Sequence, residues 1–223
     1  MLEKRSFYIN GSWVDPKEQK DIEVINPATE KVCAVISSGS KADVNDAVLA
    51  AKEAFKTWGY STKEERIALL ETFYTLYKKR WNDITDAIIQ EMGAPKDFAS
   101  KLQTGTGASH TKSFIRYLKE FEFEKPLGDH AKNQRLLYEP KGVCALITPW
   151  NWPMNQVCLK VIPALASGCT MILKPSELAP LSAMVLAELI DEAKFPKGVF
   201  NLVNGDGAIT GDALTSHPDV NMI

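Results

Sequence analysis

Apolar and polar residues follow three different spacings along this chain. Residues 7–37 have the short apolar runs of β-strands, and Asn10-Gly11 between two of these runs predicts a tight hairpin turn. Residues 42–118 have helical spacing, with an apolar residue every three or four positions. From residue 143 onward, fully apolar runs alternate with helical stretches. This pattern predicts a doubly wound parallel sheet of the Rossmann-like α/β class, preceded by a region of helices and short strands.

The helical region predicts helices with defined ends. Gly59 should end the first helix, and its inner face is an apolar stripe of Val44, Ala47, Val48, Ala51, Phe55 and Trp58. Ser61 and Glu64 have the spacing of a capping box, which predicts the start of the next helix. The buried face of that helix should contain Ile67, Leu70, Tyr74 and Tyr77.

Two more helices are expected before residue 120. Gly93 and Pro95 should end the third, whose inner positions include Ile84, Ala87, Ile88 and Glu91. Residues 98–119 predict the fourth, although Gly105 and Gly107 disfavour a helix there.

Residues 120–140 follow none of these patterns. Phe121-Glu-Phe-Glu alternates apolar and charged residues, and Arg135-Leu-Leu-Tyr follows after a Gly-Asp turn. Such a segment predicts an extended arm that leaves the main body, or an edge strand that pairs with another chain. We therefore divide the chain into residues 1–119, an arm at 120–140, and an α/β core at 141–223.

The α/β core should contain four strands and the helices between them. The strands are expected at 143–147, 170–173, 199–203 and 220–223. Helices should run from Pro153 towards Gly168, over 180–193, and over 208–214.

Composition excludes several classes of protein. The chain has 223 residues, 45% of them hydrophobic, and its 26 basic and 28 acidic residues leave a net charge of −2, so nucleic-acid binding is not expected. The four cysteines form no CxxC pair and the three histidines lie far apart, which argues against a metal site. No apolar run has the length of a membrane span or the character of a signal peptide. We expect a soluble cytoplasmic protein.

Polar loops follow three of the predicted strands. They are Thr148–Pro153, Lys174–Glu177 and Asn204–Gly207. Ligands of doubly wound sheets bind beyond the carboxyl ends of the strands. The sequence therefore predicts a nucleotide cleft at this edge.

Each loop offers a chemical role and a plain structural alternative. Asn151 is an amide donor suited to an oxyanion, or it caps the following helix. Lys174 and Glu177 suit a ribose and its phosphates, or they are a solvated lysine and a glutamate at a helix N-terminus. The third loop has the pattern GxGxxxG, which differs from the GxGxxG dinucleotide fingerprint.

Six segments occur in a characteristic order. They are Ile25-Asn-Pro-Ala-Thr, Glu139-Pro-Lys-Gly-Val, Thr148-Pro-Trp-Asn-Trp-Pro, Pro163-Ala-Leu-Ala-Ser-Gly-Cys, Leu173-Lys-Pro-Ser-Glu and Val199-Phe-Asn-Leu-Val-Asn-Gly. Together they resemble the NAD(P)-dependent aldehyde dehydrogenase superfamily, over essentially the whole chain. The resemblance implies that a cysteine thiolate attacks an aldehyde, that hydride passes to the nicotinamide, and that water activated by a glutamate hydrolyses the thioester.

The resemblance also implies roles for individual residues. Asn151 matches the amide of the oxyanion hole. The cofactor-binding positions are Ile147, Thr148, Pro149, Trp150, Lys174, Ser176, Glu177, Gly207 and Gly211. A carboxylate at Glu177 would repel a 2′-phosphate, so NAD is expected rather than NADP. Residues 120–140 match the arm that joins subunits, which implies a homo-oligomer, a dimer or a tetramer.

The chain departs from the family's pattern after Ile223. The segments that carry the general base and the nucleophile, Glu-Leu-Gly-Gly-Lys and Gly-Gln-x-Cys, are absent, and so is the catalytic domain. The chain's own cysteines lie in apolar surroundings, which raise a thiol pKa, so we expect them to be structural. We expect the cofactor-binding half of an aldehyde dehydrogenase, inactive alone. The alternative is a half-length, non-catalytic protein that binds a nucleotide or caps a partner.

Overall fold

A five-stranded sheet forms the centre of the molecule, and the computed structural model describes all 223 residues. Three of its strands are parallel: β8 (Val143–Ile147), β9 (Thr170–Lys174) and β10 (Phe200–Leu202). The hairpin of β2 (Phe7–Ile9) and β3 (Ser12–Val14) extends the sheet beyond β10 in antiparallel orientation. The expected parallel sheet is therefore confirmed, and the N-terminal hairpin turns it into a mixed sheet.

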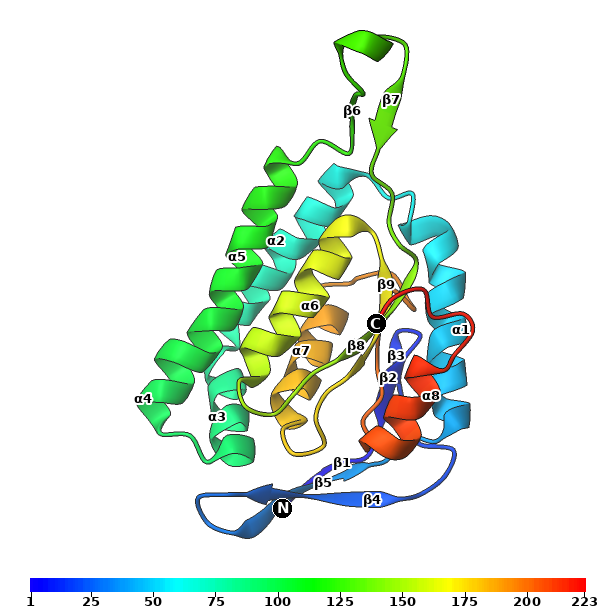
Figure 1. The fold of residues 1–223 in the computed structure, drawn as a ribbon. Helices are drawn as coiled ribbons and strands as arrows, with labels where there is room; N and C mark the ends of the chain where they lie inside the picture. Colours follow the sequence, from blue (N-terminus) through cyan, green and yellow to red (C-terminus); the bar gives the residue numbers. More distant parts are fainter.

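Helices cover both faces of this sheet (Figure 1). On one face lie α6 (Pro153–Ser167) and α7 (Leu181–Glu192), and on the other α1 (Lys41–Trp58) and the short α8 (Asp212–Thr215). The side chains of β8 alternate accordingly. Cys144 and Leu146 belong to the larger apolar core under α6 and α7, whereas Val143 and Ala145 belong to the smaller core under α1. Burial on both faces explains why the strand is apolar throughout.

An outer layer of helices packs on α6 and α7. It consists of α2 (Lys63–Lys79), α3 (Trp81–Met92) and α5 (Gly105–Glu120). A short helix α4 (Lys96–Phe98) and a π-helical turn (Ala99–Thr104) lead into α5. No helix in the structure combines the length and the apolar character that crossing a membrane requires.

Close packing of α5 against α2 explains why Gly107 interrupts the apolar face of α5. A Cβ at this position would collide with the hydroxyl of Tyr77 on α2. Tyr77 is fully buried, and its hydroxyl donates to the carbonyl of Thr104 at 3.0 Å. The glycine therefore lets α5 approach α2 closely, which compensates for its low helix propensity.

A small sheet and the arm complete the fold. Strands β1 (Leu2–Lys4), β5 (Lys31–Ser37) and β4 (Asp21–Asn26) form a separate three-stranded sheet. Residues 120–140 contain a two-stranded ribbon, β6 (Glu124–Pro126) and β7 (Arg135–Leu137), which projects from the body (Figure 1). The side chains of both ribbon strands are exposed.

The structure corrects the start of α2 by one residue. The capping box is Thr62 with Glu65, not Ser61 with Glu64. Ser61 is unavailable as a cap because its hydroxyl donates to the carbonyl of Trp58 at 2.6 Å and accepts from Arg66 at 2.9 Å.

The inner face of α2 also differs from the expected one. Its buried residues are Arg66, Leu70, Phe73 and Tyr77, whereas Ile67 and Tyr74 are half-buried. On α1, Phe55 is likewise half-buried although the rest of its predicted stripe is buried.

Two further element boundaries differ from the predicted ones. The predicted helix at 208–214 begins as a π-helical turn, Gly207–Gly211, before α8. The predicted strand at 220–223 is reduced to a single parallel bridge between Met222 and Cys144. There the carbonyl of Met222 accepts from the Ala145 amide, and the Asn221 amide donates to the Val143 carbonyl, both at 2.8 Å.

Candidate functional site

The carboxyl ends of the three parallel strands bring the three polar loops to one edge of the sheet. Ile147 pairs with Lys174 in the register of β8 and β9, and the Thr148 amide extends this pairing by donating to the Lys174 carbonyl at 3.2 Å. On the other side of β9, the amide of Val203 donates to the carbonyl of Leu173 at 3.0 Å. The loops after β8, β9 and β10 are therefore neighbours, as the sequence predicts.

Lys174 ties the second loop to the third. Its side chain is almost fully buried, and Nζ donates to the carbonyls of Gly205 at 2.7 Å and Pro175 at 3.1 Å. The carboxylate of Glu177 lies 3.6 Å from the same nitrogen. Burial lowers the pKa of Lys174, and the charge of Glu177 opposes that shift. The alternative of a solvated lysine is therefore wrong.

Glu177 and Ser176 occupy the turn between β9 and α7. The carboxylate of Glu177 is only partly covered and stays open to a ligand. The hydroxyl oxygen of Ser176 accepts from the amide of Leu178 at 3.2 Å and thereby holds the turn.

The third loop is shaped by glycines and by Asp206. Gly205 has a φ of 156°, and a Cβ there would collide with Thr210, so only glycine fits. The Asp206 carboxylate accepts from the Ile209 amide at 2.7 Å, which lowers the pKa of Asp206. A Cβ on Gly207 would meet only open space, and one on Gly211 would touch the stem of Lys174 at ordinary distance. Gly207 therefore leaves an unobstructed surface in the loop that Lys174 holds through Gly205.

Asn151 lies in the exposed part of the first loop, together with Pro149 and Trp150. The N-cap position of α6 is occupied by Trp152, and no side chain makes a capping hydrogen bond there. The alternative that Asn151 caps this helix is therefore wrong. The Asn151 amide makes no hydrogen bond within the chain, and Pro153 fixes the backbone directly after the loop.

Trp150 lines a cavity that does not include Lys174. Its exposed ring lines a separate cavity of about 420 Å³, together with Ile25, Pro27, Glu91 and Leu178. Thr148 is buried at the end of β8. Ile147 lines another cavity, on the α6 side of that strand.

Glu91 is a functional candidate that the sequence did not reveal, because it was taken only as part of the inner face of α3. It is almost fully buried at the end of α3, and its carboxylate accepts from the amides of Leu181 and Ser182 and from the Ser182 hydroxyl. Glu91 thus caps α7 from another helix. Burial raises its pKa to about 7.

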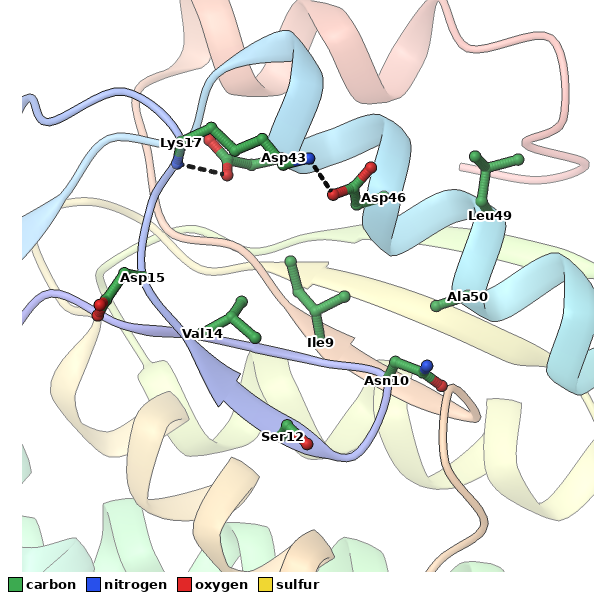
Figure 2. A pocket seen from close by; sticks show the side chains of 10 residues that line it. All are labelled: Ile9, Asn10, Ser12, Val14, Asp15, Lys17, Asp43, Asp46, Leu49 and Ala50. Atoms are coloured by element: carbon green, nitrogen blue, oxygen red, sulfur yellow. Dashed lines mark hydrogen bonds and ion pairs between the residues drawn. The ribbon is translucent and has the colours of Figure 1, made fainter.

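A cavity of about 590 Å³ lies between the β2–β3 hairpin and α1 (Figure 2). Asp43 accepts from the amides of Lys17 and Ser40 at 3.0 and 2.9 Å. The ammonium of Lys17 pairs with Asp46 at 2.6 Å. These contacts fix the segment after the hairpin on α1.

Comparison with known proteins decides the family. The model of the aldehyde dehydrogenase family matches residues 13–223. This chain belongs to the aldehyde dehydrogenase family. A similar curated relative is the 3-succinoylsemialdehyde-pyridine dehydrogenase of a Pseudomonas species, 48% identical over all of this chain and 46% of the relative. The chain spans about half the length of the curated relatives that it matches.

Solved structures of aldehyde dehydrogenases agree with the fold described above. The enzyme from Bartonella henselae superposes with a TM-score of 0.97 at 55% identity, over 99% of this chain and 46% of that one. Aldehyde dehydrogenase C of Pseudomonas syringae gives 0.95 at 45% identity, over 98% of this chain and 44% of that one. That protein was crystallised as a mutant with NAD⁺ and octanal.

Proposed function

We propose that this chain is the NAD-binding half of an aldehyde dehydrogenase that oxidises an aldehyde to a carboxylic acid. The observation that carries the proposal is the edge formed by the three loops, where buried Lys174 faces the open Glu177 beside unobstructed Gly207. A cation, a carboxylate and bare backbone are the groups that a ribose and its phosphates require. NAD⁺, when bound, supplies the acceptor for hydride.

The charge of each residue determines which part of the cofactor it binds. The carboxylate of Glu177 accepts hydrogen bonds from ribose hydroxyls and repels a phosphate on the 2′ oxygen. Lys174 is already held by two carbonyls, so it orients the loops and presents its remaining N–H towards the ligand. The surface at Gly207 allows the pyrophosphate to approach the backbone.

Asn151 is the one catalytic residue that we assign to this chain. Its amide N–H groups are free and exposed, so they can donate to the oxygen of an aldehyde as negative charge develops there. We infer that the nucleophile and the general base come from a segment outside these 223 residues. The cysteines of the chain do not lie in the loop of Asn151, and burial raises the pKa of Cys158 to about 12.

The arm supports a second part of the proposal, the joining of two copies of this chain. Its ribbon exposes Leu127, Leu136 and Leu137, and its strands have free edges. Exposed apolar residues on an unpaired strand favour pairing with another strand.

A binding experiment with the 223-residue chain tests the cofactor assignment. Calorimetric titration should show binding of NAD⁺, with NADP⁺ weaker by roughly tenfold or more because its 2′-phosphate meets Glu177. The Glu177→Gln variant should narrow this difference. Glu64→Gln, at an exposed glutamate in the outer helix α2, should leave this difference in affinity unchanged. Equal affinities in the unaltered chain, or a preference for NADP⁺, would contradict the role of Glu177.

An activity assay tests the assignment of Asn151 as the chain's one catalytic group. The pure chain, mixed with NAD⁺ and an aldehyde such as octanal, should form no NADH. Formation of NADH at a rate proportional to the chain's concentration would show that a nucleophile is present within these residues.

A further inference from the structure

Two asparagines of this chain are followed by glycine, Asn10 before Gly11 and Asn204 before Gly205. In such a dipeptide the backbone nitrogen of the glycine can attack the side-chain amide of the asparagine. Glycine favours this attack because it has no Cβ that would hinder the approach. The two dipeptides have the same local chemistry, so the fold decides which of them reacts.

The fold leaves the first dipeptide free to react. Asn10 is exposed in the turn between β2 and β3, and it borders the cavity of about 590 Å³ (Figure 2). The side-chain amide of Asn10 makes no hydrogen bond within the chain, whose only bond at this residue comes from the backbone N–H. The strands pair Ile9 with Ser12 across the turn, and the Gly11 amide has no acceptor. Both reacting groups are therefore available, and water reaches them.

The fold holds the second dipeptide in place. Asn204 is almost fully buried, and its side-chain amide donates to the sulfur of Met184 at 3.4 Å. The Asn204 carbonyl accepts from the amide of Gly39 at 2.8 Å, and the carbonyl of Gly205 accepts from Lys174. The backbone is thus fixed on both sides of the bond that would have to rotate, and water is excluded.

The hairpin turn itself requires the reactive residues. Asn10 has a φ of 53° and Gly11 a φ of 74°, and a turn with two positive φ angles favours asparagine followed by glycine. A Cβ on Gly11 would also collide with the side chain of Lys197. The geometry that closes the hairpin therefore selects a dipeptide that is chemically labile.

We propose that Asn10 is a site of spontaneous modification, where asparagine converts to aspartate and isoaspartate, and that the fold protects Asn204. The Gly11 nitrogen attacks the side-chain carbonyl carbon of Asn10 and loses its proton, and the side-chain nitrogen leaves as ammonia. Water then opens the resulting succinimide by breaking one of its two C–N bonds. One bond gives aspartate and the other isoaspartate. One water is consumed, one ammonia is released, and nothing is oxidised or reduced.

Isoaspartate at this position would loosen the hairpin from the central sheet. The Asn10 amide donates to the side-chain oxygen of Asn201 in β10 at 2.9 Å. Asn201 is fully buried, and its side-chain nitrogen already binds the carbonyls of Met171 and Gly198. Isoaspartate inserts a methylene group into the backbone of the turn and shifts that amide. The buried oxygen of Asn201 then lacks a donor, which lowers the stability of the fold.

The experiment incubates the 223-residue chain at pH 8, folded in buffer and, in parallel, unfolded in guanidinium chloride. Peptide mapping by mass spectrometry then follows the exchange of the side-chain NH₂ for OH at each asparagine and separates isoaspartate from aspartate. In the unfolded chain both dipeptides should convert at similar rates. In the folded chain Asn10 should stay within about tenfold of its unfolded rate. Asn204 should be slower by roughly a hundredfold or more, because it reacts only when the core opens.

A matched variant tests the consequence for stability. Asn10→Gly keeps a residue that accepts a positive φ but has no side-chain amide to react. Incubation should lower the melting temperature of the unaltered chain by about 2–4 °C, the shift expected for one lost hydrogen bond, and should leave that of the variant unchanged.

Two results from the folded chain would overturn the proposed site, and neither depends on the folding of a variant. One is conversion of Asn204 as fast as that of Asn10, and the other is protection of Asn10 as strong as that of Asn204. An unchanged melting temperature after Asn10 has converted to isoaspartate would overturn the link to Asn201.

Discussion

Two buried ionisable side chains hold the loops of the candidate site from beneath. Lys174 binds carbonyls of its own loop and of the loop after β10, and Glu91 binds the first amides of α7. Charged side chains are seldom fully buried without partners, and both of these have several. The turn that carries Glu177 is therefore fixed at both ends, at the end of β9 by Lys174 and at the start of α7 by Glu91.

Glu91 should make stability depend on pH. Its pKa is about 7 in the folded chain, against 4.5 for the free side chain, so the folded state retains a proton that the unfolded state has released. The contribution of this proton to the free energy of unfolding is fully present below about pH 4.5 and is lost as the pH rises through 7. The total loss is up to roughly 3 kcal/mol. Thermal melting at pH 5 and pH 8 measures this loss.

The matched variant is Glu91→Gln, which keeps an acceptor for α7 but cannot ionise. Its melting temperature should vary less between pH 5 and pH 8 than that of the unaltered chain. If both proteins show the same pH dependence, the titrating group lies elsewhere.

For single residues, the sequence was informative where the ends of strands carried polar residues. Lys174 and Glu177 were identified because a buried strand ends at them, and their contacts agree with that placement. Glu91 was not identified as a cap, because a glutamate near the end of a helix carries no sign of its partner. That partner, Ser182, is 91 residues away and is brought close only by the packing of α3 on α7.

Among the elements, the contact between α2 and α5 shows how a glycine decides the distance between helices. The two glycines at the start of α5 look equivalent in the sequence, where both disfavour a helix. In the structure they differ. Gly107 faces Tyr77 without room for a methyl group, whereas a methyl group at Gly105 would make only ordinary contacts.

Alanine substitution should therefore have opposite effects at these two positions. Gly107→Ala should destabilise the chain by about 1–3 kcal/mol, because overpacking against Tyr77 outweighs the gain of roughly 1 kcal/mol in helix propensity. Gly105→Ala should be neutral or stabilising by up to about 1 kcal/mol. Urea unfolding gives both values, and equal shifts of the two midpoints would refute this account.

Element types could be predicted from spacing, but their ends depended on tertiary contacts. The helix at 41–58 and the strand at 143–147 agree with their apolar patterns. The start of α2 moved because Ser61 bonds to Trp58 and Arg66, and these contacts come from the packing of the preceding turn. Charge suggests a surface position for Arg66, whereas it lies on the buried face of α2 and its guanidinium covers the turn at Gly168.

For the whole molecule, the ribbon at 120–140 is the part that folds away from the core. It contains the paired strands β6 and β7 and projects from the body, and its role as an arm between subunits stays a prediction. The antiparallel addition of the N-terminal hairpin to the sheet was not predicted. Nothing local in residues 7–14 marks β10 as their neighbour.

The exposed ribbon leads to a prediction about the number of copies of the chain that associate. If the ribbon joins two copies, Leu137→Lys should weaken self-association by roughly tenfold or more, because a charge replaces an apolar contact. Leu49→Lys is the control, since Leu49 is similarly exposed but lies on α1. Light scattering across a dilution series measures the mass. A chain that is monomeric without any substitution would contradict the role of the arm.

The position of the β2–β3 hairpin also sets an order of folding. Tyr8 pairs with Leu202, and the Asn10 amide donates to the side chain of Asn201. Strands β2 and β3 are therefore synthesised long before β10, their partner in the sheet. Closing so long a loop is entropically costly and slow. The three parallel strands can form beforehand, so a hairpin that is synthesised before them docks after them.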